Sequence, residues 1–129
     1  MGYSAEHLVI VVDDDPKIRE SLENLLKAAG FTAVVFPSAE ETLQSGSLAQ
    51  ASCLITDVRM PGIQGLELQR LVKRDYPALP VIVITGHRDD HVKQNALSAG
   101  AAYFLYKPFD PKTLLHAIHT GISSSAQGA

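Results

Sequence analysis

The sequence predicts an α/β protein of three layers, in which five helices cover the two faces of one five-stranded parallel sheet. Three observations lead to this prediction. Five short apolar runs of strand length alternate with segments whose apolar residues recur at helical spacing. Such alternation implies right-handed crossovers, which produce a parallel sheet. Four of the runs end in a charged, hydroxyl or glycine residue, as strands do where their carboxyl ends carry a site.

The composition limits the chain to one ordinary globular domain. It has 129 residues, of which 46% are hydrophobic and 19% are charged. The longest apolar runs fall well short of the roughly 20 residues of a membrane span, and no secretory signal opens the chain. The single cysteine, Cys53, gives no disulfide framework, and the net charge of -3 disfavours a nucleic-acid surface. We therefore expect a cytoplasmic protein that contacts neither a membrane nor nucleic acid through this chain.

The first strand and helix are the most clearly marked elements. Residues 1–7 form a short polar segment, and we expect a flexible N-terminus there. Residues 8–12 form a β-branched run typical of a strand buried on both faces. Asp15 and Pro16 then supply an N-cap and a first-turn proline. Apolar residues follow at helical spacing, and Gly30 is placed to end the helix.

The next elements lead to the central strand. Residues 32–36 predict the second strand, and residues 38–41 have the form of a capping box that opens a short helix. This helix ends near Gly46, and a connection follows up to residue 52. Residues 53–56 predict the third strand, which places Asp57 at its tip.

The second half continues the alternation. A helix is predicted from about 66 to 75, before Pro77, and residues 81–85 predict the fourth strand. Residues 89–99 predict a helix closed by Gly100. This helix has few apolar residues, so we expect it to be the most mobile one.

The last strand and helix complete the domain. Residues 102–106 predict the fifth strand, and Asp110 with Pro111 repeats the cap and proline signal before a helix that reaches about Ile122. Residues 123–129 are small and polar, so we expect them to form a flexible tail. The folded domain therefore spans residues 8–122.

Three carboxylates follow two of the predicted strands and suggest a metal site. Asp13 and Asp14 follow the first strand, and Asp57 ends the third. Crowded carboxylates repel one another unless a cation lies among them, and an all-oxygen environment suits Mg2+, with Mn2+ as a substitute. Because a Mg2+ site is often completed by phosphate oxygens, the pattern points to phosphoryl chemistry.

Asp57 is the candidate nucleophile of that chemistry, because it stands alone on its strand whereas Asp13 and Asp14 form a pair. Lys107 follows the fifth strand and can neutralise phosphate oxygens, while Thr85 ends the fourth and can donate a hydrogen bond. Each residue taken singly has a simpler interpretation, as a helix cap, a turn residue, a solvated lysine or a strand-end hydroxyl. Their joint placement at the ends of four strands is what favours a site.

Five motifs occur in order along nearly the whole chain. They are Val12-Asp13-Asp14, Arg19, Asp57 with Met60-Pro61-Gly62 and Gly65, Val83-Ile84-Thr85-Gly86, and Lys107-Pro108-Phe109. This set resembles the receiver domain of response regulators, in the CheY-like superfamily. The residues within the motifs are similar to those of the FixJ-like subgroup. The resemblance covers residues 8 to about 122 and implies the flavodoxin-like (β/α)5 receiver fold.

The resemblance implies a signalling phosphoacceptor rather than a conventional enzyme. Asp57 would accept a phosphoryl group from a phosphohistidine of a sensor histidine kinase or a histidine phosphotransfer protein. Asp13, Asp14 and Asp57 would hold Mg2+, and the backbone carbonyl of Arg59 would complete the protein ligands. Phosphorylation would then control a downstream partner or an attached output domain.

The resemblance also implies a switch. Lys107 would pair with the phosphoryl group, and Thr85 would move toward it on activation. The family often has an aromatic residue three positions before the lysine whose ring turns inward with the threonine; here it is Phe104, which lacks a hydroxyl and also fits a plain core role. We expect a homodimer of the phosphorylated form through residues 89–122.

Two positions tune hydrolysis of the acyl phosphate in the family, and here they are Arg59 and His87. Neither is a carboxylate or amide that would readily hold an attacking water in line. We therefore hypothesise that phosphate is lost slowly.

Two other functions share parts of this pattern. A phosphatase of the haloacid-dehalogenase type would use Asp13 as nucleophile and Asp15 as general acid, but its signature expects Thr or Val at Lys17 and leaves Asp57 without a role. A flavodoxin-like cofactor binder would need amides and hydroxyls in its first loop, which is acidic here. A purely structural domain would leave the three strand-end acids unexplained.

Overall fold

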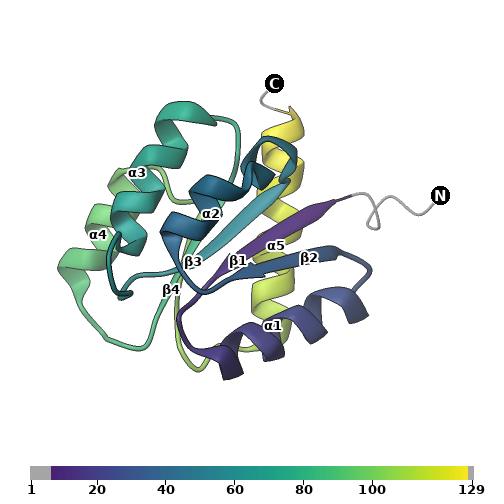
Figure 1. The fold of residues 1–129 in the computed structure, drawn as a ribbon, viewed down its shortest axis with the longest axis horizontal. Helices are drawn as coiled ribbons and strands as arrows, with labels where there is room; N and C mark the ends of the chain where they lie inside the picture. Colours follow the sequence, from purple (N-terminus) through teal and green to yellow (C-terminus); the bar gives the residue numbers. More distant parts are fainter. Residues whose placement is uncertain (1–6, 128–129) are drawn as a thin grey trace.

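The computed structural model describes residues 7–127 and has the predicted fold. Flexible segments were predicted at residues 1–7 and 123–129, and of these, residues 1–6 and 128–129 lie outside the described residues. Five parallel strands form one sheet in the order β2-β1-β3-β4-β5 (Figure 1). The strands are β1 (Leu8–Val12), β2 (Thr32–Phe36), β3 (Cys53–Asp57), β4 (Val81–Thr85) and β5 (Tyr103–Tyr106).

Five α-helices connect and follow the strands and cover both faces of the sheet. They are α1 (Pro16–Ala28), α2 (Ala39–Ser45), α3 (Gly65–Asp75), α4 (Asp90–Ser98) and α5 (Pro111–Gln127). Helices α1 and α5 pack on one face and α2, α3 and α4 on the other (Figure 1). The central strands β1, β3 and β4 are buried between these layers, as their apolar sequences predict.

Side-chain caps set the starts of three helices. The Asp15 carboxylate accepts the backbone N–H of Lys17 at 2.9 Å, and the Ser38 hydroxyl accepts that of Glu41 at 3.1 Å. Asp89 caps α4 in the same way. These bonds satisfy N–H groups that have no partner within the helix, so the caps predicted at Asp15 and Ser38 are confirmed.

Apart from shifts of one residue at the ends of some elements, the structure differs from the predicted elements at η2 and at the end of α5. A short 3-10 helix, η2 (Ser47–Gln50), lies in the segment that we predicted as a plain connection. Four residues are too few to show a period in the sequence. The last helix was predicted to end near Ile122, and α5 continues to Gln127 because residues 123–127 contain no proline or glycine to stop it.

The parallel register brings the strand ends of interest to one edge of the sheet. Val12, the last residue of β1, pairs with Thr56, and Asp57 pairs with Ile84 of β4. The backbone N–H of Lys107 donates to the carbonyl of Thr85 at 2.8 Å, which fixes the lysine beside the end of β4. None of the helices within residues 7–127 is long and apolar enough to cross a membrane.

Candidate functional site

Three carboxylates meet at the carboxyl edge of the sheet. Asp13 follows β1, Asp14 is the next residue, and Asp57 ends β3. Each offers one oxygen, and these oxygens all lie within 4.8 Å of one another. Asp13 is fully buried and Asp57 is 7% exposed, whereas Asp14 is exposed. The structure therefore brings the predicted metal ligands together, with two at the floor of the site and one at its rim.

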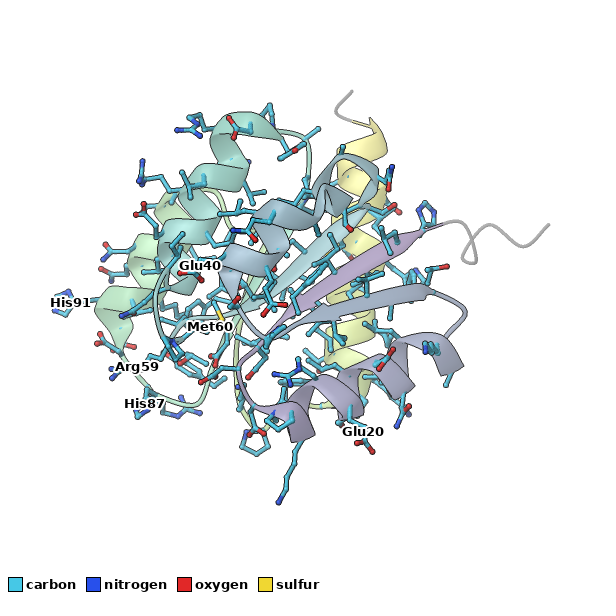
Figure 2. All side chains as sticks on the ribbon, viewed as in Figure 1. Glu20, Glu40, Arg59, Met60, His87 and His91 are labelled. Carbon is cyan, nitrogen blue, oxygen red and sulfur yellow. The ribbon has the colours of Figure 1, made fainter. Side chains whose placement is uncertain are left out.

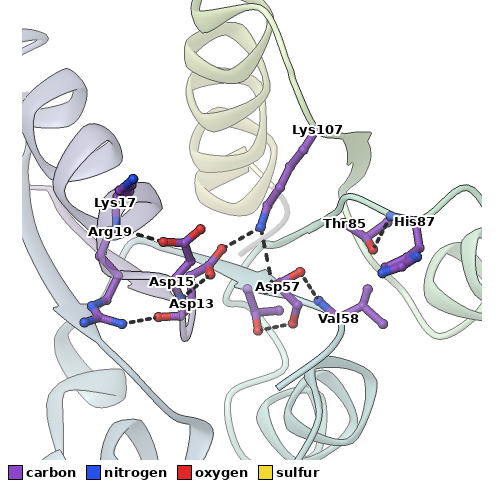
Figure 3. A network of polar contacts seen from close by, with 10 residues as sticks. Asp13, Asp15, Lys17, Arg19, Asp57, Val58, Thr85, His87 and Lys107 are labelled. Carbon is purple, nitrogen blue, oxygen red and sulfur yellow. Dashed lines mark hydrogen bonds and ion pairs between the residues drawn. The ribbon is translucent and has the colours of Figure 1, made fainter. Parts of the chain in front are cut away.

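Backbone groups fix the two buried carboxylates. Asp57 Oδ1 accepts the N–H of Val58 at 2.8 Å, and Asp13 Oδ1 accepts the N–H of Asp15 at 2.9 Å (Figure 3). The guanidinium of Arg19 donates to the backbone carbonyl of Asp13 at 2.7 Å and ties the first turn of α1 to the site. These bonds hold the acids in position without neutralising them.

Lys107 is the cation of the site and lies between the buried acids. Its Nζ is 2.8 Å from Asp13 Oδ2 and 3.5 Å from Asp57 Oδ2 (Figure 3). Burial lowers the pKa of this ammonium, but the hydrogen bond and charge of Asp13, together with Asp57, outweigh that effect and raise the pKa above its usual value. Lys107 is therefore a permanent positive charge.

One ammonium does not balance three carboxylates. Burial raises the pKa of Asp57 above its usual value, and the nearby charge of Asp13 raises it further, although Lys107 and the Val58 N–H act in the opposite direction. The three acids and Lys107 together carry a formal charge of -2. Such a cluster of oxygen donors with excess negative charge fits a hard divalent cation such as Mg2+.

The carboxylates open into a depression of about 350 Å³ at the sheet edge. Thr85, which is 2% exposed, borders it, and its hydroxyl oxygen accepts the N–H of His87 at 3.2 Å. Arg59 and His87 are exposed at the rim (Figure 2). The lining residues are Asp13, Asp14, Asp15, Asp57, Arg59, Thr85, Gly86, His87 and Lys107.

Phe104 is the predicted site residue that does not border the depression. It is half-buried on β5, against the cluster formed with α2, α3 and α4. Its ring meets that of Tyr106 edge-on, with 5.3 Å between centroids. Phe104 thus belongs to the packing beside the site.

The acids that a dehalogenase-type phosphatase would use are engaged elsewhere. Asp15, its general acid, caps α1, and the two oxygens of Asp13, its nucleophile, contact the Asp15 N–H and Lys107. Asp57 in turn contacts the Val58 N–H at 2.8 Å and Lys107 at 3.5 Å.

Sequence reasoning missed an aromatic and cationic stack beside Thr85. Tyr106 pairs with Thr85 across β4 and β5, and the Arg88 guanidinium lies 4.4 Å from its ring centroid. The Tyr106 hydroxyl is buried and has no hydrogen-bond partner among residues 7–127. The position of Tyr106 next to Lys107 was the available signal, but nothing in the sequence pairs it with Arg88.

Gly65, in contrast, belongs to a motif that the sequence did single out. A Cβ atom at this position would collide with the backbone carbonyl oxygen of Asp57. Only glycine therefore allows α3 to begin directly beneath the end of β3.

Comparison with known proteins gives consistent matches over most of the chain. The family model of the response regulator receiver domain matches residues 9–119. Nodulation protein W of Bradyrhizobium diazoefficiens is 44% identical over 89% of this chain and 51% of its own length. The transcriptional regulatory protein FixJ of Azorhizobium caulinodans is 41% identical over 92% of this chain and 56% of its own length. The chain thus spans about half the length of these relatives.

A solved structure shows the same architecture. A response regulator receiver domain protein from Clostridium thermocellum superimposes with a TM-score of 0.90, at 28% identity, over 95% of this chain and 99% of its own.

Proposed function

Because this chain belongs to the response regulator receiver domain family, we propose that Asp57 is its phosphoacceptor in two-component signalling. One observation carries the proposal: Asp57 ends β3 within the cluster of Asp13 and Asp14, and Lys107 lies 3.5 Å from its Oδ2. The residues proposed as nucleophile, metal ligands and charge-neutralising group thus lie at one sheet edge.

Asp13, Asp14 and Asp57 are the proposed Mg2+ ligands, with Mn2+ as a substitute, and the carbonyl of Arg59 is the proposed fourth. When bound, Mg2+ would neutralise phosphoryl oxygens and so lower the barrier to attack by an anionic carboxylate. The chain provides three carboxylate oxygens within 4.8 Å of one another for this role.

The proposed donor is a phosphohistidine of a sensor histidine kinase or of a histidine phosphotransfer protein. An oxygen of Asp57 forms a bond to phosphorus while the bond between phosphorus and the donor nitrogen breaks, and the imidazole leaves with the electron pair. Lys107 is close enough to Asp57 to stabilise the phosphoryl oxygens. Thr85 uses its oxygen to accept the His87 N–H, so its own proton is available for a phosphoryl oxygen.

The added phosphoryl group carries charge and acceptor oxygens that draw Thr85 and Lys107 inward. The movement of Thr85 and Lys107 would shift the conformations of α4 and of β5, where Phe104 lies. Helix α4 is loosely held, because Ala96 is the one fully buried residue among its nine. We propose that the altered face from 89 to 122 binds a second phosphorylated copy.

Arg59 and His87 border the site, and neither side chain is a carboxylate or amide that would orient an attacking water. We therefore propose that the acyl phosphate is hydrolysed slowly. A lifetime of seconds at neutral pH would contradict this proposal.

The output of the domain is the last step of the proposal. The prediction that this chain contacts no nucleic acid gains no support from its relatives, since one of them is named as a transcriptional regulatory protein. We propose that phosphorylation controls either an attached output domain or a separate partner, in the cytoplasm, where a kinase draws on ATP.

Intact-mass spectrometry tests the proposed phosphoacceptor. Wild type and the Asp57→Asn variant are incubated with acetyl phosphate, with and without Mg2+. A gain of one phosphoryl group in the wild type that requires both Asp57 and Mg2+ is the expected result. An adduct that survives Asp57→Asn but disappears in Asp13→Asn would instead identify Asp13 as the nucleophile.

A further inference from the structure

The loop between β3 and α3 carries a proposed metal ligand, and its two ends are joined to each other. The N–H of Gly65 donates to the carbonyl of Val58 at 2.8 Å, so residues 58–65 form a closed loop. The N–H of Val58 in turn bonds to Asp57 Oδ1 and to the carbonyl of Ile84. Arg59 follows this anchored base and borders the depression.

The far side of the same loop is held by a residue from another helix. Glu40 Oε2, on α2, accepts the backbone N–H of Ile63 at 2.9 Å. A Cβ atom at Gly62 would overlap this carboxylate, so the backbone of Gly62 lies directly against it. Figure 2 shows Glu40 beside the loop that carries Arg59 and Met60. The loop is therefore anchored at its base by the sheet and on its far side by Glu40.

We propose that Glu40 is a positioning residue for the metal site, whose carboxylate holds the loop so that Arg59, the residue with the proposed carbonyl ligand, stays at the depression. This inference rests on the proposed function, in which that carbonyl is a Mg2+ ligand. Glu40 acts through the loop, because it is not among the residues that line the depression.

The support that Glu40 provides is itself rigid. Ser38 caps α2, and Glu40 is its second residue, next to the positive end of the helix dipole. Glu40 is half-buried, and its acceptor oxygen meets the loop from a helix that is fixed by the buried side chains of Ala39 and Thr42. A loop fixed in this way does not have to be ordered when the ion binds.

Mg2+ makes such support effective because it demands near-ideal octahedral geometry. A carbonyl ligand on an unsupported loop must be ordered when the ion binds, and the conformational entropy lost in that step weakens the affinity for the ion. Loss of an outer hydrogen bond that orients a metal ligand typically weakens binding by about 10- to 100-fold. We expect the lower end here, since Glu40 supports one ligand of the proposed set.

Three variants separate the effect of the Glu40 hydrogen bond on Mg2+ affinity from the effect of its charge. Glu40→Ala removes the acceptor, and Glu40→Gln keeps an acceptor oxygen but removes the charge. Glu41→Ala is the matched control, since Glu41 is the next residue of the same helical turn, is exposed, and contributes to the cap through its backbone N–H. Mg2+ affinity is measured by isothermal titration calorimetry, and amide exchange of residues 59–63 by NMR. Urea unfolding in EDTA checks that each variant is folded.

We expect Glu40→Ala to weaken Mg2+ binding by about tenfold and to accelerate amide exchange in the loop. Glu40→Gln should retain most of the affinity, and Glu41→Ala should match the wild type. Phosphorylation of Glu40→Ala by acetyl phosphate should recover at saturating Mg2+.

Three outcomes would overturn the role of Glu40. They are an unchanged Mg2+ affinity in folded Glu40→Ala, an equal loss in Glu40→Gln, or an equal loss in Glu41→Ala, since the last two would assign the effect to charge. Failure of the wild type itself to bind Mg2+ would refute the proposed function, so the two failures are distinguishable.

Discussion

Lys107 makes its shorter contact with Asp13 rather than with Asp57, at 2.8 Å against 3.5 Å. The ammonium is thus shared between the two buried acids, and neither receives full compensation. Asp57 consequently keeps a pKa above its usual value, chiefly because of its burial and then the charge of Asp13. The surroundings of Asp57 therefore disfavour its ionised form, and a bound cation would offset this penalty.

This imbalance predicts that Asp57→Asn stabilises the metal-free protein. A carboxyl whose pKa is higher in the folded than in the unfolded state stabilises the fold below the unfolded pKa and loses that contribution as pH rises through the folded pKa. At pH 7 in EDTA we therefore expect Asp57→Asn to raise the free energy of unfolding by about 1–2 kcal/mol. Urea denaturation of both proteins measures the difference.

The pH dependence and the metal provide the controls for that prediction. The difference between the proteins should shrink as pH falls below the raised pKa of Asp57, because the wild-type carboxyl is then neutral. Mg2+ should also reduce the difference, since it binds the folded wild type more tightly. A wild type that is more stable than Asp57→Asn at pH 7 without metal would contradict the assigned electrostatics.

The thiol of Cys53 provides a separate test of how well β3 is buried. Cys53 is fully buried on β3, and burial raises the pKa of its thiol to about 12. The reactive thiolate is therefore scarce at neutral pH, and reagents cannot reach it. We expect no labelling by iodoacetamide under native conditions and complete labelling in urea, as measured by mass spectrometry. Rapid native labelling would show that β3 opens readily.

At the scale of elements, α4 is attached to its neighbours by few contacts. Its one fully buried residue is Ala96, and Val92 is half-buried. A buried side chain of α3, Gln69, donates through its amide nitrogen to the Ala96 carbonyl at 2.8 Å. The Gln69 amide oxygen is buried without a partner among the described residues. This one hydrogen bond fastens a lightly packed helix to a well-packed one.

Gln69→Met should release α4 while leaving the fold intact. Methionine keeps the volume and removes the unpaired buried oxygen, and the Ala96 carbonyl still accepts the N–H of Ala101 at 3.0 Å. We expect the free energy of unfolding to change by less than about 1 kcal/mol, whereas amides of α4 exchange several-fold faster. Hydrogen exchange by NMR measures this, with α1 as the internal reference. Unchanged exchange in α4 would show that Gln69 does not fasten it.

The elements that the sequence predicted well share a local signal. β1, β2 and β4 match their predicted bounds because each is an apolar run that a charged, proline or glycine residue terminates. Helix starts at Asp15 and Ser38 were equally visible, since a cap lies within three residues of the N–H that it accepts. The 3-10 helix at 47–50 was not, because its four residues are stabilised without any periodic pattern.

The functional residues also fall into those that the sequence pattern predicted and those that it did not. The sequence predicted that Asp13, Asp57, Thr85 and Lys107 lie together, because strand ends of a parallel sheet share an edge, and the structure brings them to one depression. It did not predict the contacts of Glu40 and Gln69, which join α2 to a loop and α3 to α4 across 23 and 27 residues. Such contacts depend on how helices pack laterally, which no local pattern encodes.

At the scale of the whole molecule, phosphorylation is expected to change the association state. Helix α4, within the segment proposed for self-association, carries Leu97, a large apolar side chain that is 43% exposed. Wild type treated with acetyl phosphate and Mg2+ should sediment as a dimer at micromolar concentration, and the untreated protein as a monomer. Asp57→Asn is the control and should remain monomeric. A monomeric phosphorylated protein would rule out self-association as the output.

Helix α5 also sets where a fused reporter would lie. It starts four residues after Lys107, at the sheet edge that carries the acids, and Gly121 near its far end packs on Pro80, before the start of β4 (Figure 1). Its 17 residues span about 25 Å at 1.5 Å per residue. A fluorescent protein joined after Gln127 would therefore lie at the opposite pole from Asp57 and leave the approach of a phosphodonor unobstructed. Given the proposed phosphorylation of Asp57, the domain is suited to serve as the sensing half of a genetically encoded biosensor for that reaction.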